Sequence, residues 1–309
     1  MLGIKAFAPA SIGNIGVGFD ILGMAIERPG DEVIARPSGK PGLRIARITG
    51  HGGKLPYEVE KNTAGMAALC LLEHLGETGR GIELEIHKKM PLGSGLGSSA
   101  ASAAAAVLAV SELLRTGLSK RDLLPFACAG EQVASGSFHA DNVAPSLLGG
   151  IILIRDNETL DVHRLHAPRG LYAAVVYPHL EVLTKTARAI LKPDVPLADF
   201  VRQSANVAGF VAGCFNGDVG LIGRSLRDVV IEPQRAGLIT GFYDVKDAAM
   251  AEGALGCSIS GSGPSVFALC ANSLTAENAG QAMQRAFARH GVESQVFLSA
   301  VNQEGAQIQ

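Results

Sequence analysis

A run of glycine and serine between a predicted strand and a predicted helix constrains this chain more than any other feature. The run is Gly93-Ser94-Gly95-Leu96-Gly97-Ser98-Ser99. Before it, residues 82–87 alternate apolar and polar side chains, as in a strand with one wet face. After it, alanine dominates residues 100–114, which favours a helix. Since glycines let successive main-chain N–H groups converge on an anion, and a helix N-terminus adds its dipole, this arrangement predicts a phosphate-binding loop.

Two familiar phosphate-binding motifs do not fit this loop. A Walker A loop needs a lysine that the run lacks. A Rossmann fingerprint is met formally by Gly95-x-Gly97-x-x-Ala100, but the acidic residue roughly 20 positions on should end a second strand. The nearest candidate, Glu112, lies in a predicted helix. The remaining alternative, a loop that only turns the chain, fits poorly because seven consecutive Gly, Ser or Leu residues make a poor turn.

Length and charge narrow the class of protein. The 309 residues suggest two domains, at about 150 residues each. A 47% hydrophobic and 18% charged composition is typical of a globular protein. The net charge of −2 gives no basic surface for nucleic acid or an anionic membrane. Five cysteines without a C-x-x-C pair suit a reducing compartment.

No segment reads as a membrane anchor. The longest uncharged run, residues 90–111, is Gly/Ser-rich in its first half and too short in its apolar part to cross about 30 Å of hydrocarbon. The first residues, MLGIKAFAPAS, lack the apolar stretch of a signal peptide. We therefore expect a cytoplasmic protein.

Strands and helices mix without a strict βα repeat, which favours an α+β fold over a doubly wound sheet. The pattern predicts strands over 150–154, 172–177 and 265–270, and helices starting after Asn62 and over 121–134, 183–191, 199–214 and 244–254. The polar stretch 155–161 predicts the boundary between domains 1–155 and 156–309.

A phosphate loop without a lysine needs positive charge from elsewhere, most simply Mg²⁺ held by a hydroxyl and a carboxylate. Ser99 can supply the hydroxyl. Helix 121–134 places Glu131 on the apolar stripe that also carries Leu124 and Cys128. Because an unpaired charge there is costly, either an arginine or a cation should neutralise Glu131.

Three further segments contain polar side chains among glycines or in a predicted loop. Residues 9–20 carry Asn14 and Asp20, residues 137–145 carry His139, Asp141 and Asn142, and residues 258–265 form another glycine turn ahead of a strand. Taken singly, the first could be a loop with capping Asx residues and the second a surface loop.

Together these segments resemble the homoserine kinases, a family of the GHMP small-molecule kinase superfamily that also contains galactokinase, mevalonate kinase and phosphomevalonate kinase. The likeness runs from Pro9 to about Cys270, with the motifs in family order and spacing. Residues 91–102 match the superfamily's phosphate loop. More particular to the family are P-A-S-x-x-N-x-G-x-G-F-D at 9–20, H-x-D-N-V-A-P at 139–145, T-K-T-A-R at 184–188 and E-P-x-R at 232–235.

The resemblance implies an N-terminal domain like the second domain of ribosomal protein S5 and a C-terminal ferredoxin-like domain. It implies ATP-dependent phosphorylation of the L-homoserine side-chain hydroxyl, on the route to threonine, by a homodimer that uses Mg²⁺. Ser99 and Glu131 would hold the metal, and Asn62 would contact adenine. The ATP phosphates would lie on Pro91, Leu92, Gly93, Ser94, Gly95, Leu96, Gly97, Ser98, Ser99, Ala100 and Ala101.

The zwitterionic substrate needs an anion for its ammonium group and arginines for its carboxylate. The resemblance assigns Asn14 and Asp20 to the amino group and hydroxyl, and Arg188 and Arg235 to the carboxylate. Thr184, Gly261 and Asn142 complete the substrate-binding residues. An acid with two arginines suits an amino acid and suits mevalonate poorly, because mevalonate has no amine.

Where galactokinase and mevalonate kinase carry an aspartate that can act as a base, homoserine kinases carry asparagine, here Asn142. Since an amide cannot accept the proton, we expect catalysis without a protein general base, with Asn142 orienting the hydroxyl. Asp141 is a competing candidate that an extended segment would turn away from the site. His139 could touch the phosphate or support the loop, and we favour support.

Two rival functions remain. One is another GHMP kinase, such as a mevalonate kinase or an archaeal-type shikimate kinase. The other is a catalytically inactive homologue that binds an amino acid or nucleotide, although such proteins usually lose the metal ligands or loop glycines kept here. The sequence does not decide the oligomeric state, inhibition by threonine, closure of residues 51–61 over ATP, or the packing of the last forty residues.

Overall fold

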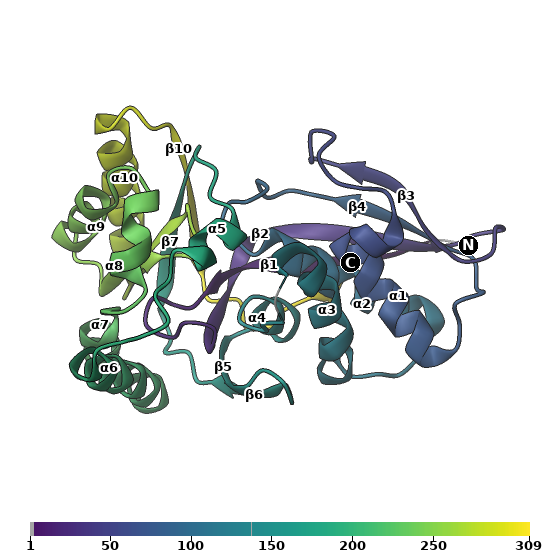
Figure 1. Ribbon diagram of the computed structural model, residues 1–309, viewed down its shortest axis with the longest axis horizontal. Helices are drawn as coiled ribbons and strands as arrows, with labels where there is room; N and C mark the ends of the chain where they lie inside the picture. The colour runs from purple at the N-terminus through teal and green to yellow at the C-terminus, as the bar shows by residue number, and fades with distance from the viewer. Residues whose placement is uncertain (1–2, 137) are drawn as a thin grey trace.

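Two β-sheets organise the computed structural model, which describes residues 3–136 and 138–309 (Figure 1). The smaller sheet and its helices form the left end of the view, and the larger sheet runs through the rest of the molecule. The central path of the larger sheet has the order β11-β1-β2-β4-β3, and β5 and β6 extend it from β2. The seven strands are β1 (Ile4–Gly13), β2 (Leu22–Pro37), β3 (Leu43–Thr49), β4 (Ile82–His87), β5 (Ile151–Asp156), β6 (Asp161–Leu165) and β11 (Gln307–Ile308).

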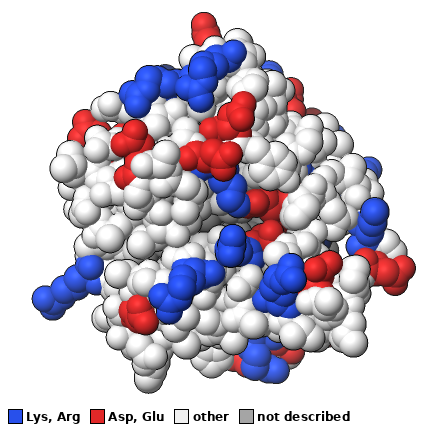
Figure 2. All heavy atoms as spheres, turned by 90° about the vertical axis from the view of Figure 1, so that its left-hand side faces the viewer, with Lys and Arg blue, Asp and Glu red and all other residues white. Residues whose placement is uncertain are grey.

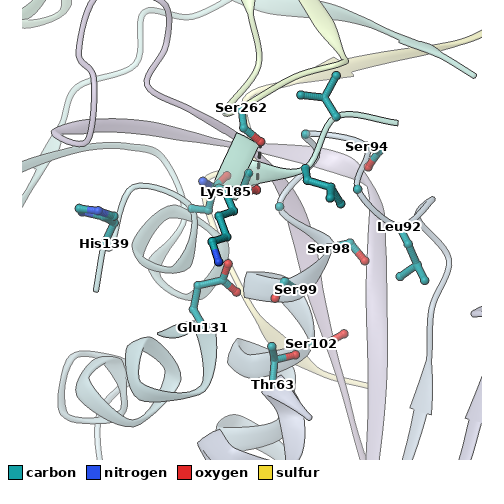
Figure 3. A pocket seen from close by; sticks show the side chains of 18 of the residues that line it. Thr63, Leu92, Ser94, Ser98, Ser99, Ser102, Glu131, His139, Lys185 and Ser262 are labelled. Carbon is teal, nitrogen blue, oxygen red and sulfur yellow. Dashed lines mark hydrogen bonds between the residues drawn. The ribbon is translucent and has the colours of Figure 1, made fainter. Parts of the chain in front are cut away.

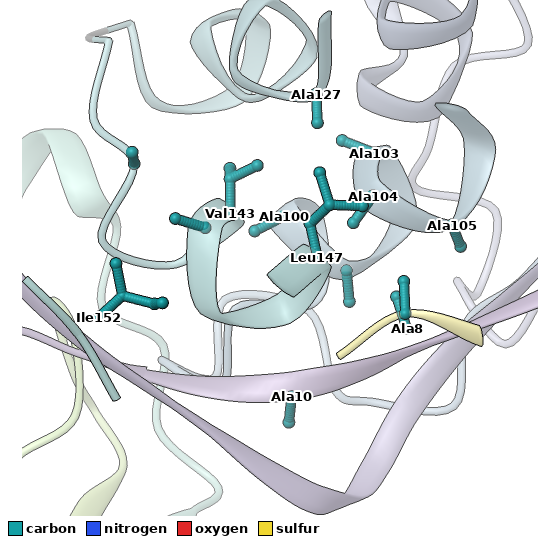
Figure 4. Packing of buried hydrophobic residues seen from close by; sticks show 14 of the residues in the cluster. Ala8, Ala10, Ala100, Ala103, Ala104, Ala105, Ala127, Val143, Leu147 and Ile152 are labelled. Atoms are coloured by element: carbon teal, nitrogen blue, oxygen red, sulfur yellow. The ribbon is translucent and has the colours of Figure 1, made fainter. Parts of the chain in front are cut away.

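Helix α2 (Ser98–Leu114) follows β4 and the glycine run, as the sequence predicts, and it is buried on almost every side. It packs on β1 and β2 and is covered by α1 (Thr63–Leu75), α3 (Lys120–Ser135) and α4 (Val143–Leu148). Figure 4 shows Ala100 and Ala104 of α2 on either side of Leu147 of α4, above the strands of the larger sheet. Because alanine is small, the helix can approach all of these neighbours closely.

The smaller sheet confirms the predicted ferredoxin-like domain. Its strands are β7 (Tyr172–Pro178), β8 (Gly256–Ile259), β9 (Val266–Cys270) and β10 (Ser294–Ala300), all paired antiparallel in the order β10-β7-β9-β8. Helices separate β7 from β8 and β9 from β10, which gives the βαββαβ succession of that fold. Helices α9 (Phe242–Ala251) and α10 (Ser273–Arg289) pack on this sheet around a second apolar core.

The predicted domain boundary at residue 155 falls inside a β-hairpin of the larger sheet. Strands β5 and β6 pair antiparallel from Ile151↔Leu165 to Asp156↔Asp161, so the polar stretch 155–161 contains the hairpin turn and not a linker. Both strands belong to the larger sheet, and the chain leaves that sheet after Leu165. It returns at its end, where β11 pairs with β1.

Before α9, the connection from β7 to β8 contains four further helices: α5 (Thr184–Ala189), α6 (Leu197–Asn216), α7 (Val219–Ser225) and α8 (Glu232–Arg235). Two 3₁₀ turns, η1 (Val59–Lys61) and η2 (Ala236–Leu238), complete the described elements. Figure 2 shows the end of the molecule that carries the C-terminal helices, where basic and acidic side chains are interspersed around a hollow. Among the described helices, none has the length and apolar character needed to cross a membrane.

Candidate active site

A cavity of about 520 Å³ brings the three glycine-rich segments together with the 139–142 segment. Most of the predicted site residues line it: Asn14, Asp20, Asn62, Leu92, Gly93, Ser94, Gly95, Gly97, Ser98, Ser99, Glu131, Asn142, Thr184, Arg188, Arg235 and Gly261. A second cleft lies between α6–α7 and α9 and is lined by basic and acidic side chains. It shares no lining residue with the first cavity.

The start of α2 is prepared for an anion. Its N-cap residue, Gly97, has no side chain to accept the first N–H groups of the helix, and no other described side chain caps them. By contrast, Asn62 caps α1 and Ser119 caps α3. The Ser94 hydroxyl oxygen is also buried and has no hydrogen-bond partner among the described residues. Free N–H groups and an unpartnered hydroxyl facing one cavity are what a bound phosphate would satisfy.

Two glycines of the loop allow other segments to approach it. Gly97 has φ +68°, and a Cβ there would lie 2.1 Å from Ser11 Oγ and 3.0 Å from Asn142 Oδ1. Gly95 has φ +77°, and its Cβ would lie 2.6 Å from the main-chain oxygen of Ser260. Both positions therefore require glycine for conformation and for space.

Hydrogen bonds between the segments fix the end of the cavity that carries Asn14, Asp20 and Gly261. The Asn14 side chain donates to the Gly261 carbonyl at 2.9 Å, and its Oδ1 accepts from the Asp20 main-chain N–H at 2.9 Å. The Gly261 N–H donates to the Gly13 carbonyl at 3.1 Å. Asn14 and Asp20 both adopt positive φ, 67° and 62°, which few residues other than glycine do. Asn14 thus holds Asp20 in place and joins two loops.

Asp20 and Arg188 form a bidentate ion pair with N–O distances of 3.0 and 2.9 Å. Arg235, only 3% exposed, donates to the carbonyls of Ala187 and Gly261 at 2.9 and 3.3 Å. Both guanidinium groups lie over the Phe19 ring, at 5.1 and 5.0 Å from its centroid. The hydrogen bonds to Asp20 raise the pKa of Arg188, whereas burial lowers the pKa of Arg235. One carboxylate and two guanidinium groups therefore lie together in the cavity, with both guanidinium groups over the Phe19 ring.

Two further contacts lie beside the Asp20–Arg188 ion pair. His139 Nε2 lies 3.7 Å from Asp20, and burial lowers the pKa of the imidazole. Thr184 on α5 lies within hydrogen-bond distance of Ser262 Oγ, at 3.2 Å.

Asp141 and Asn142 both line the cavity, so the expectation that Asp141 points away is wrong. The reason is local, because the two residues form a turn before α4 and not an extended segment. Asn142 accepts from Ser11 Oγ at 2.9 Å and donates to Asp141 Oδ2 at 3.2 Å. Burial raises the pKa of Asp141 to about 7, with repulsion from Asp20 in the same direction.

Ser99 and Glu131 meet at the phosphate end of the cavity, where Figure 3 shows the carboxylate on α3 directed toward the first turn of α2. Burial raises the pKa of Glu131 to about 7. A side-chain hydrogen bond with Ser99 acts in the opposite direction, and the negative charge of Asp141 adds to the rise. A buried hydroxyl beside a buried carboxylate fits the oxygen ligands that Mg²⁺ prefers. No cluster of three or more metal-ligating side chains exists in the described residues, so phosphate or water oxygens would have to complete the shell.

Some predicted contacts are not supported. Pro91, Leu96, Ala100 and Ala101 do not line the cavity, and the last three are fully buried in the core. Asn62 lines the cavity, but its side chain accepts from two N–H groups of α1 and donates to the Pro56 carbonyl at 2.9 Å. Its observed role is to cap the helix, and its contact with adenine stays a prediction.

Three cavity residues escaped the sequence analysis. Phe19 lies within the quoted G-F-D motif, and Lys185 within T-K-T-A-R, so the motifs carried a signal that charge reasoning did not use. Lys88 directly follows β4 and is buried beneath the loop. Figure 3 shows Lys185 extending from α5 in the direction of Glu131. The phosphate loop therefore has lysines near it in space, although its own sequence has none.

The fold and this site have counterparts among known proteins. The description "GHMP kinases N terminal domain" matches residues 62–150, and "GHMP kinases C terminal" matches residues 210–289. A mevalonate kinase from L. major, 18% identical over 96% of each chain, shares the fold with a TM-score of 0.73. The architecture is thus that of the GHMP kinases.

Relatives with higher sequence identity show to which family of GHMP kinases the chain belongs. The homoserine kinase of Chlorobium phaeovibrioides is 48% identical over 100% of both chains, and that of Xanthomonas campestris is 45% identical over 98% of this chain and 93% of its own. The crystal structure of homoserine kinase from Cytophaga hutchinsonii is 52% identical, with a TM-score of 0.97 over 100% of this chain and 98% of that one. The chain belongs to the homoserine kinase family.

Proposed function

We propose that the enzyme transfers the γ-phosphoryl group of ATP to the side-chain hydroxyl of L-homoserine, giving O-phospho-L-homoserine for threonine synthesis. The observation that carries this proposal is the pairing of two features in one cavity. An uncapped helix N-terminus with the unpartnered Ser94 hydroxyl suits phosphate, and the Asp20–Arg188 pair beside it suits a zwitterion. Their proximity brings donor and acceptor together, as direct transfer requires.

The ion pair explains why an amino acid would be recognised. An α-carboxylate can replace Asp20 on the fork of Arg188 and also reach Arg235, while the ammonium group takes the freed Asp20 carboxylate. Every charge then keeps a partner. A substrate with a carboxylate but no amine would leave Asp20 unpaired beside a buried site, which disfavours mevalonate.

We propose that transfer proceeds without a protein general base. In a loose transition state the hydroxyl gains little from early deprotonation, so it can lose its proton to the phosphoryl group or to water after the P–O bond has begun to form. Asn142, fixed by Ser11 against the Gly97 turn, would orient that hydroxyl. Ser99 and Glu131 would hold Mg²⁺, which would supply charge neutralisation at the phosphates.

A coupled assay of ADP release tests the reaction. L-Homoserine should support turnover, and D-homoserine, mevalonate and shikimate should not. Turnover should also vanish when Mg²⁺ is chelated and return when it is added back. Equal rates with mevalonate or shikimate would contradict the proposed substrate, and turnover without a divalent cation would contradict the proposed metal role.

We also propose a homodimer that covers one face of α6. Leu197, Phe200, Val201 and Phe215 are 58–85% exposed and share one stripe of this helix at spacings of 3, 4 and 18 residues. An exposed apolar stripe of this kind is stabilised by a second copy. Sedimentation should show a dimer for the wild type and a monomer for F200E, and an unchanged dimer would place the interface elsewhere.

A further inference from the structure

One buried carboxylate holds both ends of the phosphate loop. Asp31 lies on β2 and is 0% exposed. Its Oδ1 accepts the main-chain N–H of Lys89, where the chain leaves β4 to enter the loop, at 2.9 Å. Its Oδ2 accepts the hydroxyls of Ser98 and Ser102, where the loop becomes α2, each at 2.9 Å. The chain between these attachments contains every glycine of the loop.

Lys88 completes the attachment from the same side. Its ammonium group contacts Asp31 and donates to the Ser98 carbonyl and to Ser102 Oγ, both at 2.7 Å. The three N–H donors of the lysine are therefore used, and its side chain is 3% exposed. Ser98 and Ser102 are one turn apart on α2, so the ion pair is bonded to the first turn of that helix, at the edge of the cavity that Lys88, Ser98 and Ser102 also line. Figure 3 shows these serines in succession along α2, with Ser99 between them.

Stability alone does not account for such a pair. Taking two charges out of water costs about as much as their attraction returns, and apolar pairs of similar size are often as stable or more stable. What an apolar pair cannot do is hold a main-chain carbonyl, a main-chain N–H and two hydroxyls at fixed positions. We propose that the Asp31–Lys88 pair is a positioning device that sets the phosphate loop and the first turn of α2 for the nucleotide. The inference rests on the proposed function, in which the ATP phosphates occupy this loop.

The double variant D31L/K88M tests this directly, because it removes both charges and so leaves no unpaired ion in the core. Calorimetric titration with Mg·ATP should show a dissociation constant raised about tenfold or more, as expected when a binding group is misplaced. Titration with L-homoserine should give the wild-type value. An ATP affinity equal to that of the wild type in the folded double variant would overturn the proposal.

A milder pair of variants decides the matter if the double variant does not fold. S102A removes one hydroxyl that links α2 to the ion pair, and S111A removes a hydroxyl from the far end of the same helix, where it bonds Thr116 at 2.6 Å. S102A should weaken Mg·ATP binding about threefold, and S111A should not, at equal losses of thermal stability. Equal ATP affinities for both would show that the network is only structural. If the wild type itself failed to bind Mg·ATP, the proposed function would be at fault and not the positioning role.

Discussion

Asn142 occupies the point where the phosphate loop meets the substrate end of the cavity. If it orients the hydroxyl, N142A should lower kcat about 100-fold, the usual cost of losing one positioned polar group in a transition state. The KM for homoserine should change little, because the charged groups that bind it remain. Steady-state kinetics with both substrates varied would measure this.

Asp141 provides the decisive comparison for that prediction. Its carboxyl group faces the same cavity and has a pKa raised to about 7, so it is chemically able to accept a proton. D141N should nevertheless keep turnover within about tenfold of the wild type, because an asparagine can still accept from Asn142. Abolition of turnover in D141N together with a harmless N142A would assign the base to Asp141.

Replacing Arg235 by lysine separates the contribution of the guanidinium geometry from that of the positive charge. R235K keeps the positive charge but loses the fork that reaches two carbonyls and that we propose also binds the substrate carboxylate. Losing one charge-assisted hydrogen bond of ~1.5–3 kcal/mol should raise the KM for homoserine about 10- to 100-fold. R227K is the matched control, because Arg227 is exposed and lies outside this cavity. A KM unchanged in R235K would remove Arg235 from the carboxylate site.

Single residues were predictable where their chemistry is conspicuous in the sequence. Glycines in a run, an acid on an apolar stripe and arginines in short motifs all pointed to the cavity, because such residues are costly or unusual where they stand. Asp31 gave no such signal, and Phe19 lay in the quoted G-F-D motif without its own chemistry marking it. An aromatic side chain and an acid in a strand are ordinary locally, and their importance comes from Arg188, Arg235 and the start of α2, which only the fold brings to them.

At the scale of elements, the phosphate loop depends on glycine at positions where another segment touches it. G95A should lose ~1 kcal/mol from its positive φ and about 1–3 kcal/mol more from the contact with the Ser260 main chain. G76A is the matched control, since Gly76 has φ +69° and open space around it, so only the first cost applies. Urea denaturation of both variants measures the difference. Equal losses would mean that the loop can move away from Ser260.

Three elements of the site were predicted to within a few residues because their periodicity is local. The strand 82–87 and the helix 100–114 became β4 and α2, and the predicted helix 121–134 became α3, which begins with a Ser119–Asp122 capping box. Strand β1 was missed because residues 9–13 were read as part of a glycine loop, although they pair with β2 up to Gly13↔Gly23. Their small side chains fit beneath α2, and that packing is invisible in the sequence.

At the scale of the whole molecule, the sequence identified two domains but not where they separate. A polar stretch between apolar strands can be a linker or a hairpin turn, and only the pairing of Ile151 with Leu165 distinguishes them. The place of the last residues depends likewise on Ala6 pairing with Ile308, at the other end of the chain. Contacts of this kind are decided by tertiary packing and leave no local pattern.

The stability of the whole molecule should also fall as the pH rises from about 4 toward 7. Burial raises the pKa of Asp141 from 3.8 to about 7 and that of Glu131 from 4.5 to about 7. The folded protein therefore holds protons that the unfolded chain releases, so the stabilising contribution is complete below about pH 4 and is lost as the pH rises toward 7. Burial lowers the pKa of His139 from its ordinary 6.5, so this residue has the opposite effect: its contribution to the stability of the folded protein is lost as the pH falls below 6.5.

The variant D141N isolates the larger of these effects. For Asp141 the difference between 3.8 and about 7 corresponds to a free energy of unfolding of the order of 4 kcal/mol. Relative to the wild type, D141N should therefore become more stable by up to this amount between pH 4 and pH 8, with the ligand-free protein in both cases. Urea denaturation at intervals of half a pH unit measures the change. A constant difference between the two proteins over this range would show that Asp141 ionises in the folded state as it does in water, and that water reaches its carboxyl group.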